Sequence, residues 1–134
     1  MHELALAEGI ILNVLDFARK SGRHIVGFRV AIGEFAQFDK RLVKELLIEL
    51  VKGTELDKAN IIVEVERAVI KCLYCGSKWG FNRLIKKLSD DQKEMIHFLP
   101  ELLNSFSKCP TCGKSDFEIE KGRSVKLVGV ELDV

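Results

Sequence analysis

CLYCG at residues 72–76 and CPTCG at residues 109–113 are the two stretches that decide how the second half of this chain folds. They contain all four cysteines of the 134-residue sequence. Two residues between cysteines let one tight turn direct both thiolates at a single ion, and four thiolates fill the tetrahedral shell of zinc. The glycine after each pair permits the left-handed backbone that such a turn uses. The sequence therefore predicts a closed, structural zinc site formed by Cys72, Cys75, Cys109 and Cys112.

Other uses of these cysteines stay open at this point. A C-x-x-C pair is also a redox motif, cysteines can be core residues, and four thiolates can hold an iron–sulfur cluster. The gap between the two pairs is longer than in the usual zinc template. Within that gap, Ser89 and Gln92 fit a capping box, and the apolar residues that follow indicate a short helical insert that Pro100 divides. Zinc remains the most economical interpretation because one ion uses both pairs.

Working outward from the cysteines, helical and strand periodicities alternate along the rest of the chain. Apolar spacing predicts a first helix over residues 4–20 and a second from the N-cap Asp39 to Gly53, and alternation predicts strands at 25–34 and 60–70. Two further strands, at 117–120 and 125–134, would most economically return to the first sheet. The predicted fold is α+β, with a small sheet of about three strands packed with two helices. Residues 1–70 and 114–134 would form this domain, and residues 71–113 the inserted zinc module with its helical insert.

Composition narrows the class of function. Hydrophobic residues make up 47% of the chain, and the formal net charge is +1. This charge gives no electrostatic reason to expect nucleic acid or an anionic membrane as a partner. An acid, Glu3, stands where a signal peptide would be basic, and no apolar run is long enough to span a bilayer. We therefore expect a cytoplasmic protein, in which paired cysteines bind metal more often than they form disulfides.

His2 is a second candidate metal ligand. A histidine in second position places the terminal amine, its own amide and its imidazole within one chelate, and the Glu3 amide can add another nitrogen. Such a set suits Ni(II) or Cu(II) in tetragonal geometry, although a solvated terminal residue is the simpler interpretation from spacing alone. His24 is expected at the surface. His97 is expected as a partly buried helix residue unless the insert folds back over the N-terminus, where it could join the set around His2.

Several stretches together resemble the HypA/HybF family of hydrogenase-maturation proteins, in its archaeal type. They are the Met1-His2-Glu3 start, the four cysteines, the strand at 26–34 and the closing stretch at 128–134, so the resemblance covers nearly the whole chain. It implies a nickel metallochaperone that delivers Ni(II) to the large subunit of [NiFe]-hydrogenase, with a HypB-type GTPase as partner and urease as another client. It further implies nickel ligation by His2 with the backbone of Met1 and Glu3, His97 as a candidate extra ligand, and zinc on the four cysteines. The paired strands around an inserted module also leave room for a homo-oligomer.

Three other classes of function compete with this interpretation. A zinc-ribbon module that binds nucleic acid would use a basic face, for which Lys71, Lys78, Arg83, Lys86 and Lys87 are candidates. A zinc-bearing adaptor without nickel would be indifferent to substitution of His2. An enzyme is not expected, because the sequence contains no phosphate-binding loop, no nucleophile–base pairing and no open metal site other than the one at His2.

Overall fold

The computed structural model describes residues 2–133, and it divides them into two compact units. The first unit consists of the residues up to Ile32, of Phe38–Val65 and of the residues from Lys126 onward; the second consists of Gly33–Gln37 and Glu66–Val125. Among the described residues, no helix is long and apolar enough to cross a membrane. The chain leaves the first unit and returns to it twice, so the second unit is an insertion made of two stretches.

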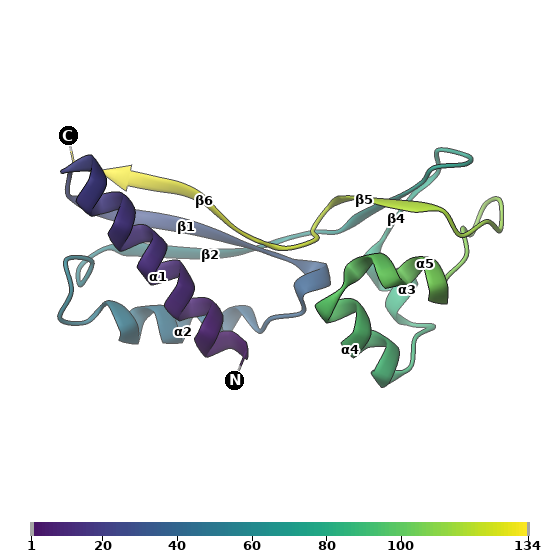
Figure 1. The fold of residues 1–134 in the computed structure, drawn as a ribbon, viewed down its shortest axis with the longest axis horizontal. Coiled ribbons are helices and arrows are strands. Elements are labelled where there is room, and N and C mark those ends of the chain that lie inside the picture. The colour runs from purple at the N-terminus through teal and green to yellow at the C-terminus, as the bar shows by residue number, and fades with distance from the viewer. Residues whose placement is uncertain (1, 134) are drawn as a thin grey trace. The chain divides into compact units, whose positions relative to one another are not determined.

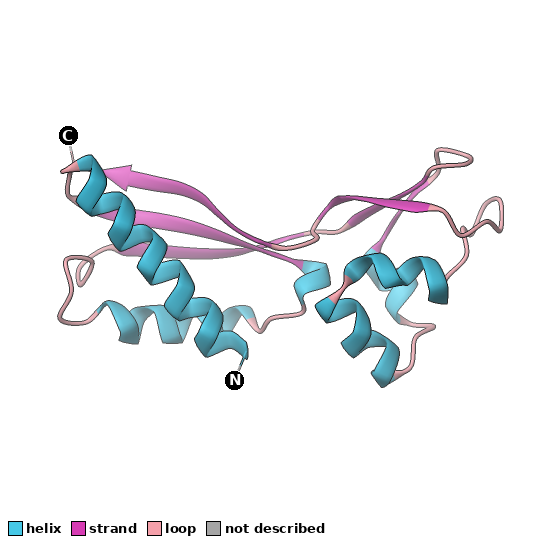
Figure 2. Ribbon diagram, in the orientation of Figure 1, coloured by secondary structure: helices cyan, strands magenta, loops and turns pink. Residues whose placement is uncertain are grey.

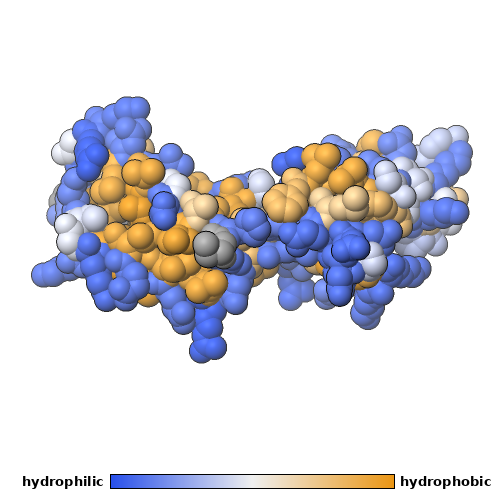
Figure 3. Space-filling view, turned by 60° about the horizontal axis from the view of Figure 1, so that its bottom comes forward, coloured by the Kyte–Doolittle hydropathy of each residue, from blue (hydrophilic) through white to orange (hydrophobic). Residues whose placement is uncertain are grey.

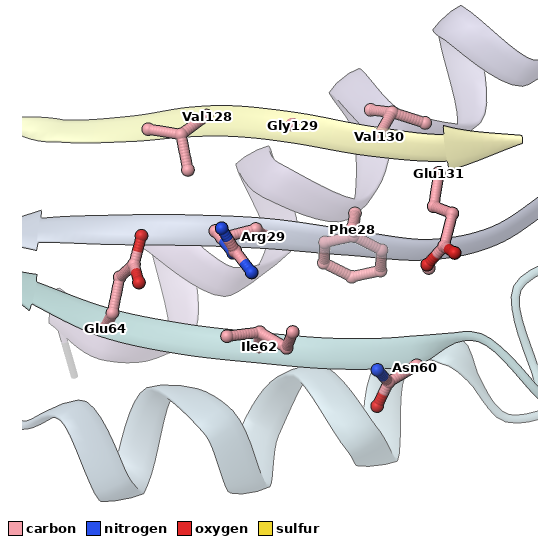
Figure 4. Close-up of a pocket in the computed structure, with 10 residues that line it drawn as sticks. Phe28, Arg29, Asn60, Ile62, Glu64, Val128, Gly129, Val130 and Glu131 are labelled. Atoms are coloured by element: carbon pink, nitrogen blue, oxygen red, sulfur yellow. The ribbon is translucent and has the colours of Figure 1, made fainter.

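In the first unit, two helices pack on one side of a three-stranded sheet (Figures 1 and 2). Its elements are α1 (His2–Ser21), β1 (Ile25–Gly33), α2 (Lys40–Val51), β2 (Asn60–Glu66) and β6 (Val125–Leu132). The sheet order is β2-β1-β6, with β1 parallel to β2 and antiparallel to β6 (Figure 4). The backbone of β1 and β6 is joined near the two ends of β1, where Asp133 N–H donates to the His24 carbonyl and Gly33 N–H to the Ser124 carbonyl.

The apolar periodicities account for the core of this unit. One stripe of α1 is buried at helical spacing, and it faces the alternate residues of β1 that are also buried. The two helices contact each other along this core, and α2 begins where the Asp39 carboxylate accepts hydrogen bonds from the N–H groups of Arg41 and Leu42. The buried side chains include Ala7, Ile11, Val14, Ala18, Phe28, Val30, Ile32, Val43, Leu47, Ile61 and Val63.

The second unit is built around a sheet of its own, with short helices on one side of it (Figure 1). The sheet order is β4-β3-β5, and both neighbours run antiparallel to β3. Its core gathers Phe35, Trp79, Leu84, Ile96 and Leu103 with the buried Cys72 and Cys109. The elements are η1 (Glu34–Ala36), β3 (Val69–Cys72), β4 (Lys78–Gly80), α3 (Phe81–Ile85), α4 (Asp90–Phe98), η2 (Pro100–Leu102), α5 (Leu103–Phe106) and β5 (Phe117–Lys121).

The α+β fold with an inserted cysteine module is confirmed, and one strand differs from expectation. The prediction that both closing strands join the first sheet is wrong for β5, which pairs with β3 from Val69–Lys121 to Cys72–Phe117. Alternation identifies a strand but does not say which partner strand completes its hydrogen bonds. The second unit also contains residues 33–37, 66–70 and 114–125 in addition to 71–113, the range that the sequence suggested for the zinc module. The predicted strand over 60–70 is also two strands, β2 and β3, in different sheets.

Candidate metal centre

Two turns at the same end of the second sheet carry the four cysteines. The first turn follows Cys72 at the end of β3 and leads into β4; the second lies between α5 and β5. Because β3 and β5 are antiparallel with Cys72 opposite Phe117, the end of β3 lies beside the start of β5, where the second turn finishes. The backbone of the two turns is also joined directly, since Leu73 N–H donates to the Asp116 carbonyl at 2.8 Å.

The two turns have the same internal structure. In the first, Gly76 N–H donates to the Cys72 carbonyl at 2.9 Å, and Gly76 has φ of 77°. In the second, Gly113 N–H donates to the Cys109 carbonyl at 2.9 Å, and Gly113 has φ of 78°. Positive φ at these positions favours glycine, as the sequence suggested. Each turn thus presents one buried and one exposed cysteine to the same point.

The four sulfurs form a cluster whose dimensions fit a tetrahedral metal. All four Sγ atoms lie within 4.8 Å of one another, with 3.6 Å between Cys72 and Cys112 and 3.7 Å between Cys75 and Cys109. A zinc ion bound at about 2.3 Å by four thiolates separates its ligands by roughly 3.8 Å, whereas a disulfide would need about 2.05 Å. The cysteine cluster therefore suits the predicted zinc site, with Cys72, Cys75, Cys109 and Cys112 as its ligands.

Backbone amides favour the thiolate form of the two buried ligands. The N–H of Cys112 and then that of Thr111 lower the pKa of Cys109 to about 6. The N–H groups of Cys75 and Tyr74 lower the pKa of Cys72 in the same way. The Ser77 and Lys114 amides lower the pKa of Cys75 and Cys112, but burial of each sulfur and then the repulsion of neighbouring thiolates outweigh them, which raises the pKa of Cys75 to about 11 and also that of Cys112. A divalent cation removes this repulsion.

Two side-chain contacts join the turns outside the sulfur cluster, and neither was predicted. The hydroxyls of Ser77 and Thr111 lie 3.0 Å apart in a hydrogen bond. The Lys114 ammonium lies 3.3 Å from the centre of the Tyr74 ring, a cation–π contact. Each pair takes one residue from each turn. Spacing alone shows no sign of them, because they depend on the two turns being placed side by side.

The N-terminal candidate lies at the start of α1 in the first unit. His2 begins the helix and is exposed, and the first four N–H groups of a helix are not needed for intrahelical hydrogen bonds. The Glu3 carboxylate accepts a hydrogen bond from Asp39 N–H at 3.2 Å, and this bond lowers the pKa of Glu3 below its ordinary 4.5. Glu3 therefore connects the start of α1 to the residue that caps α2. The role expected of Met1 lies outside the described residues.

The other two histidines occupy different settings. His24 is exposed in the turn between α1 and β1. His97 lies in the last turn of α4 in the second unit, where it is partly buried and its ring packs edge-on against Phe98 at 5.0 Å. Its Nδ1 atom is itself buried. His2 and His97 thus belong to different units, and the structure leaves the predicted role of His97 a prediction.

The basic residues of the second unit are partly neutralised within it. Lys78 pairs with Glu120 at 3.1 Å, and the acidic residues of α4 and β5 are interspersed with the cations. A nucleic-acid surface needs a sustained cationic face, with aromatic groups for stacking on single strands. The zinc-ribbon alternative is therefore not favoured.

Comparison with known proteins agrees with the metal centre. A family model described as "Hydrogenase/urease nickel incorporation, metallochaperone, hypA" matches residues 1–132. The chain is 40% identical over 134 residues to the hydrogenase maturation factor HypA of Pyrococcus horikoshii, and 41% identical to that of Pyrococcus furiosus. In both cases the match covers 99% of this chain and 96% of the relative.

Solved structures share the fold. A structure described as the solution structure of HypA protein aligns with a TM-score of 0.63 at 20% identity, over 99% of this chain and 97% of that one. The Ni metallochaperone HypA of Helicobacter pylori aligns with a TM-score of 0.59 at 18% identity, over 97% of this chain and 96% of that one. The family consists of maturation factors that bind nickel and zinc, rather than enzymes. With a family match over almost its full length, this chain belongs to the HypA family of nickel metallochaperones that serve hydrogenase maturation.

Proposed function

We propose that this chain binds one Ni(II) ion as cargo at its N-terminus and delivers it during maturation of a [NiFe]-hydrogenase. His2 supplies the imidazole, and the backbone nitrogens of Met1, His2 and Glu3 complete a set suited to nickel. The recipient is the hydrogenase large subunit, and a HypB-type GTPase is the partner in delivery. We place this activity in the cytoplasm, where the four thiolates stay reduced and available to zinc.

The family match supports this assignment, together with an exposed His2 at the start of α1. The Glu3 carboxylate accepts a hydrogen bond from Asp39 N–H, which favours the backbone nitrogen as the group that Glu3 contributes. The imidazole of His2 is exposed beside this point. A tetragonal chelate made of consecutive amides differs from helical backbone geometry, so nickel binding unwinds the first turn of α1. Opening a helix terminus has a low free-energy cost, which suits a site that must release its metal.

His97 is proposed as an additional ligand from the second unit. It is the only histidine of the sequence outside residues 2–24, and it lies at the end of α4 next to exposed apolar residues. A ligand on a separate unit can be withdrawn when that unit moves, which would weaken the nickel set at the moment of transfer.

Calorimetric titration of nickel into the untagged, zinc-loaded protein tests the N-terminal site. We expect one nickel per chain in the wild type, loss of that binding in His2→Ala, and unchanged binding in the matched control His24→Ala. Affinity should fall as pH falls, because imidazole and amides must lose protons to bind. Equal binding by wild type and His2→Ala would remove the N-terminal site from the proposal. If His97→Ala altered neither affinity nor transfer rate, His97 would be removed as a ligand.

A further inference from the structure

We propose that the uncovered face of the β2-β1-β6 sheet is a docking surface for an amphipathic helix of a partner protein. That helix would place a carboxylate against Arg29 of β1, apolar side chains on Ile62 and Val128, and cationic side chains against Glu64 and Glu131 (Figure 4). This surface is distinct from the metal centre and from the N-terminal candidate, and no role has been assigned to it above.

One side of this sheet has no covering layer within its own unit. Both helices, α1 and α2, lie on the opposite side (Figures 1 and 2). All-parallel sheets normally have both faces covered, but this sheet is mixed because β6 runs antiparallel to β1. An open face is compatible with such a sheet, so the case for a partner rests on the side chains that this face carries.

The open face is shallow, partly apolar and continuous. A hollow of about 420 Å³ runs across all three strands, from Asn60, Ile62 and Glu64 on β2 to Val128–Glu131 on β6. Ile62 is 37% exposed and Val128 46% exposed, which is high for large aliphatic side chains in a sheet. Gly27 adds no side chain to the hollow, and a Cβ at this position would lie 3.0 Å from the Asn60 carbonyl oxygen and 3.2 Å from a Glu131 carboxylate oxygen.

Charges on this face are placed for a complementary partner. Arg29 lies at the middle of the hollow, with Glu64 on one side and Glu131 on the other (Figure 4). Within residues 2–133, none of these three side chains forms an ion pair. An interface with opposite charges at these points would gain specificity and a faster association rate. A partner with one central carboxylate between cations matches the pattern.

Size favours a single helix over a second copy of this chain. Three strands about 4.8 Å apart and about seven residues long give a face of roughly 14 by 23 Å, which accommodates one helix about 10–12 Å in diameter. A second copy docked through this face alone would bury only about 330 Å² on each chain, below the ~800 Å² of a stable dimer, whereas a docked helix would be one part of a larger interface with its own protein.

The helical side of the same unit is the competing docking surface. Figure 3 shows apolar side chains gathered over α1 and α2, and Leu12, Phe17 and Ile48 are 66%, 44% and 43% exposed. Charged side chains on or next to those helices pair within the chain, as Lys20 does with Asp16 and Lys52 with Glu49, whereas Arg29, Glu64 and Glu131 form no such pair among the described residues. Ile48 therefore provides a matched control for Ile62, with the same side chain, similar exposure and the opposite side of the unit.

Binding measurements with full-length, zinc-loaded protein test this proposal. The probes are the purified HypB-type GTPase and the [NiFe]-hydrogenase large subunit of the same organism, a choice that rests on the proposed function. We expect Arg29→Glu and Ile62→Asp each to weaken binding of one probe at least tenfold. The controls Arg23→Glu and Ile48→Asp should stay within twofold of wild type. Arg29→Met keeps the apolar part of the side chain and removes only the charge, so it is a variant less prone to misfold than Arg29→Glu. It should also weaken binding, but by a smaller factor.

A photo-crosslinking residue at position 62 then identifies the occupant. Crosslinking to a helical segment of a probe that contains Asp or Glu supports the proposal. The proposal is overturned if the wild-type protein binds neither probe, or if Arg29→Glu and Ile62→Asp bind the probes as the wild type does. It is also overturned if only Ile48→Asp loses binding, or if position 62 crosslinks to a second copy of this chain. Nickel titration of the same variants separates this docking proposal from the proposed nickel function. All variants should bind nickel as the wild type does. If the wild type itself does not bind nickel, that result counts against the proposed function alone.

Discussion

At the residue scale, Glu3 shows how one side chain serves two parts of the fold. Its position near the N-terminus suggested a nickel-site role, with its carboxylate favouring the positive end of α1. In the structure, that carboxylate accepts the N–H of Asp39, while the Asp39 carboxylate accepts N–H groups in the first turn of α2. The starts of both helices are thus joined through two acids. Displacement of the Glu3 carboxylate would break its hydrogen bond to the residue that caps α2.

The Glu3 carboxyl should titrate below pH 4.5. Its pKa is lowered chiefly by the Asp39 N–H, so this contact contributes stability above the unfolded pKa and loses it as pH falls through the folded value. The side-chain ¹³C chemical shift of Glu3, followed by NMR from pH 7 to pH 2.5, measures the midpoint. Glu8, exposed on the same helix, is the control carboxyl. A Glu3 midpoint at or above 4.5 would show that the bond to Asp39 is absent in solution.

At the scale of elements, the second unit begins and ends at one tight crossing of three backbone segments. Gly33 N–H donates a hydrogen bond to the Ser124 carbonyl oxygen, and Phe35 N–H donates one to the Gly122 carbonyl oxygen. The Glu34 carboxylate accepts from Ala68 N–H at 2.6 Å, which joins the third segment to the first. A Cβ on Gly33 would lie 2.5 Å from backbone atoms of Gly122, so the segments approach this closely only because glycine occupies the crossing.

Two glycine-to-alanine substitutions should therefore shift stability in opposite directions. Gly33→Ala forces backbone atoms apart and should lower the free energy of unfolding by about 1–3 kcal/mol. Gly9→Ala lies within α1, where a Cβ meets nothing within 4 Å, and should raise it by about 0.5–1 kcal/mol. Urea denaturation followed by circular dichroism measures both. A neutral Gly33→Ala would mean that the crossing is looser than described.

The N-cap of α2 offers a second test at this scale. Asp39→Ala removes the acceptor of the Arg41 and Leu42 N–H groups and should lower the free energy of unfolding by about 1 kcal/mol. Asp39→Asn retains a capping oxygen and should recover most of this loss in the same urea experiment. If the two variants were equally destabilised, the charge of Asp39, rather than its hydrogen bonds, would be the stabilising feature.

At the scale of the whole molecule, the chain has two cores with different means of stabilisation. The first unit packs two helices, of 20 and 12 residues, on a sheet, and its core consists of apolar side chains. The second unit is about as large as the first but has shorter helices, and two of its core members, Cys72 and Cys109, are also ligands of the candidate zinc site. Small domains commonly require metals or disulfides because their cores are limited. Zinc binding and folding of the second unit should therefore be coupled.

Removal of zinc should unfold the second unit and leave the first folded. Trp79, the only tryptophan of the chain, is buried in the second core against Phe117, so its fluorescence reports that unit alone. A strong chelator should shift Trp79 emission to longer wavelength, while circular dichroism retains the helical signal of α1 and α2. Added zinc should reverse the shift. Unchanged Trp79 emission after verified metal removal would show that the second core is stable without metal.

Local pattern was sufficient for α1, β1, α2 and the two cysteine turns, because helical periodicity, alternation and C-x-x-C spacing each encode geometry over a few residues. It also identified the capping box at Ser89 and the break at Pro100, which depend on nearest neighbours alone. These features follow from backbone sterics and ligand chemistry that act locally. These features can therefore be predicted from short stretches of sequence without knowledge of the fold.

Only tertiary structure decided the features that depend on partners far apart in the sequence. It assigned β5 to the second sheet, since a strand's partner is set by long-range hydrogen bonds and burial rather than by its own alternation. It also placed Glu3 on Asp39, Tyr74 on Lys114, and Arg29 between two acids on an open face. The sequence by itself determined which residues can bind metal and which segments form helices or strands. Packing of the completed sheets determined which surfaces those residues share.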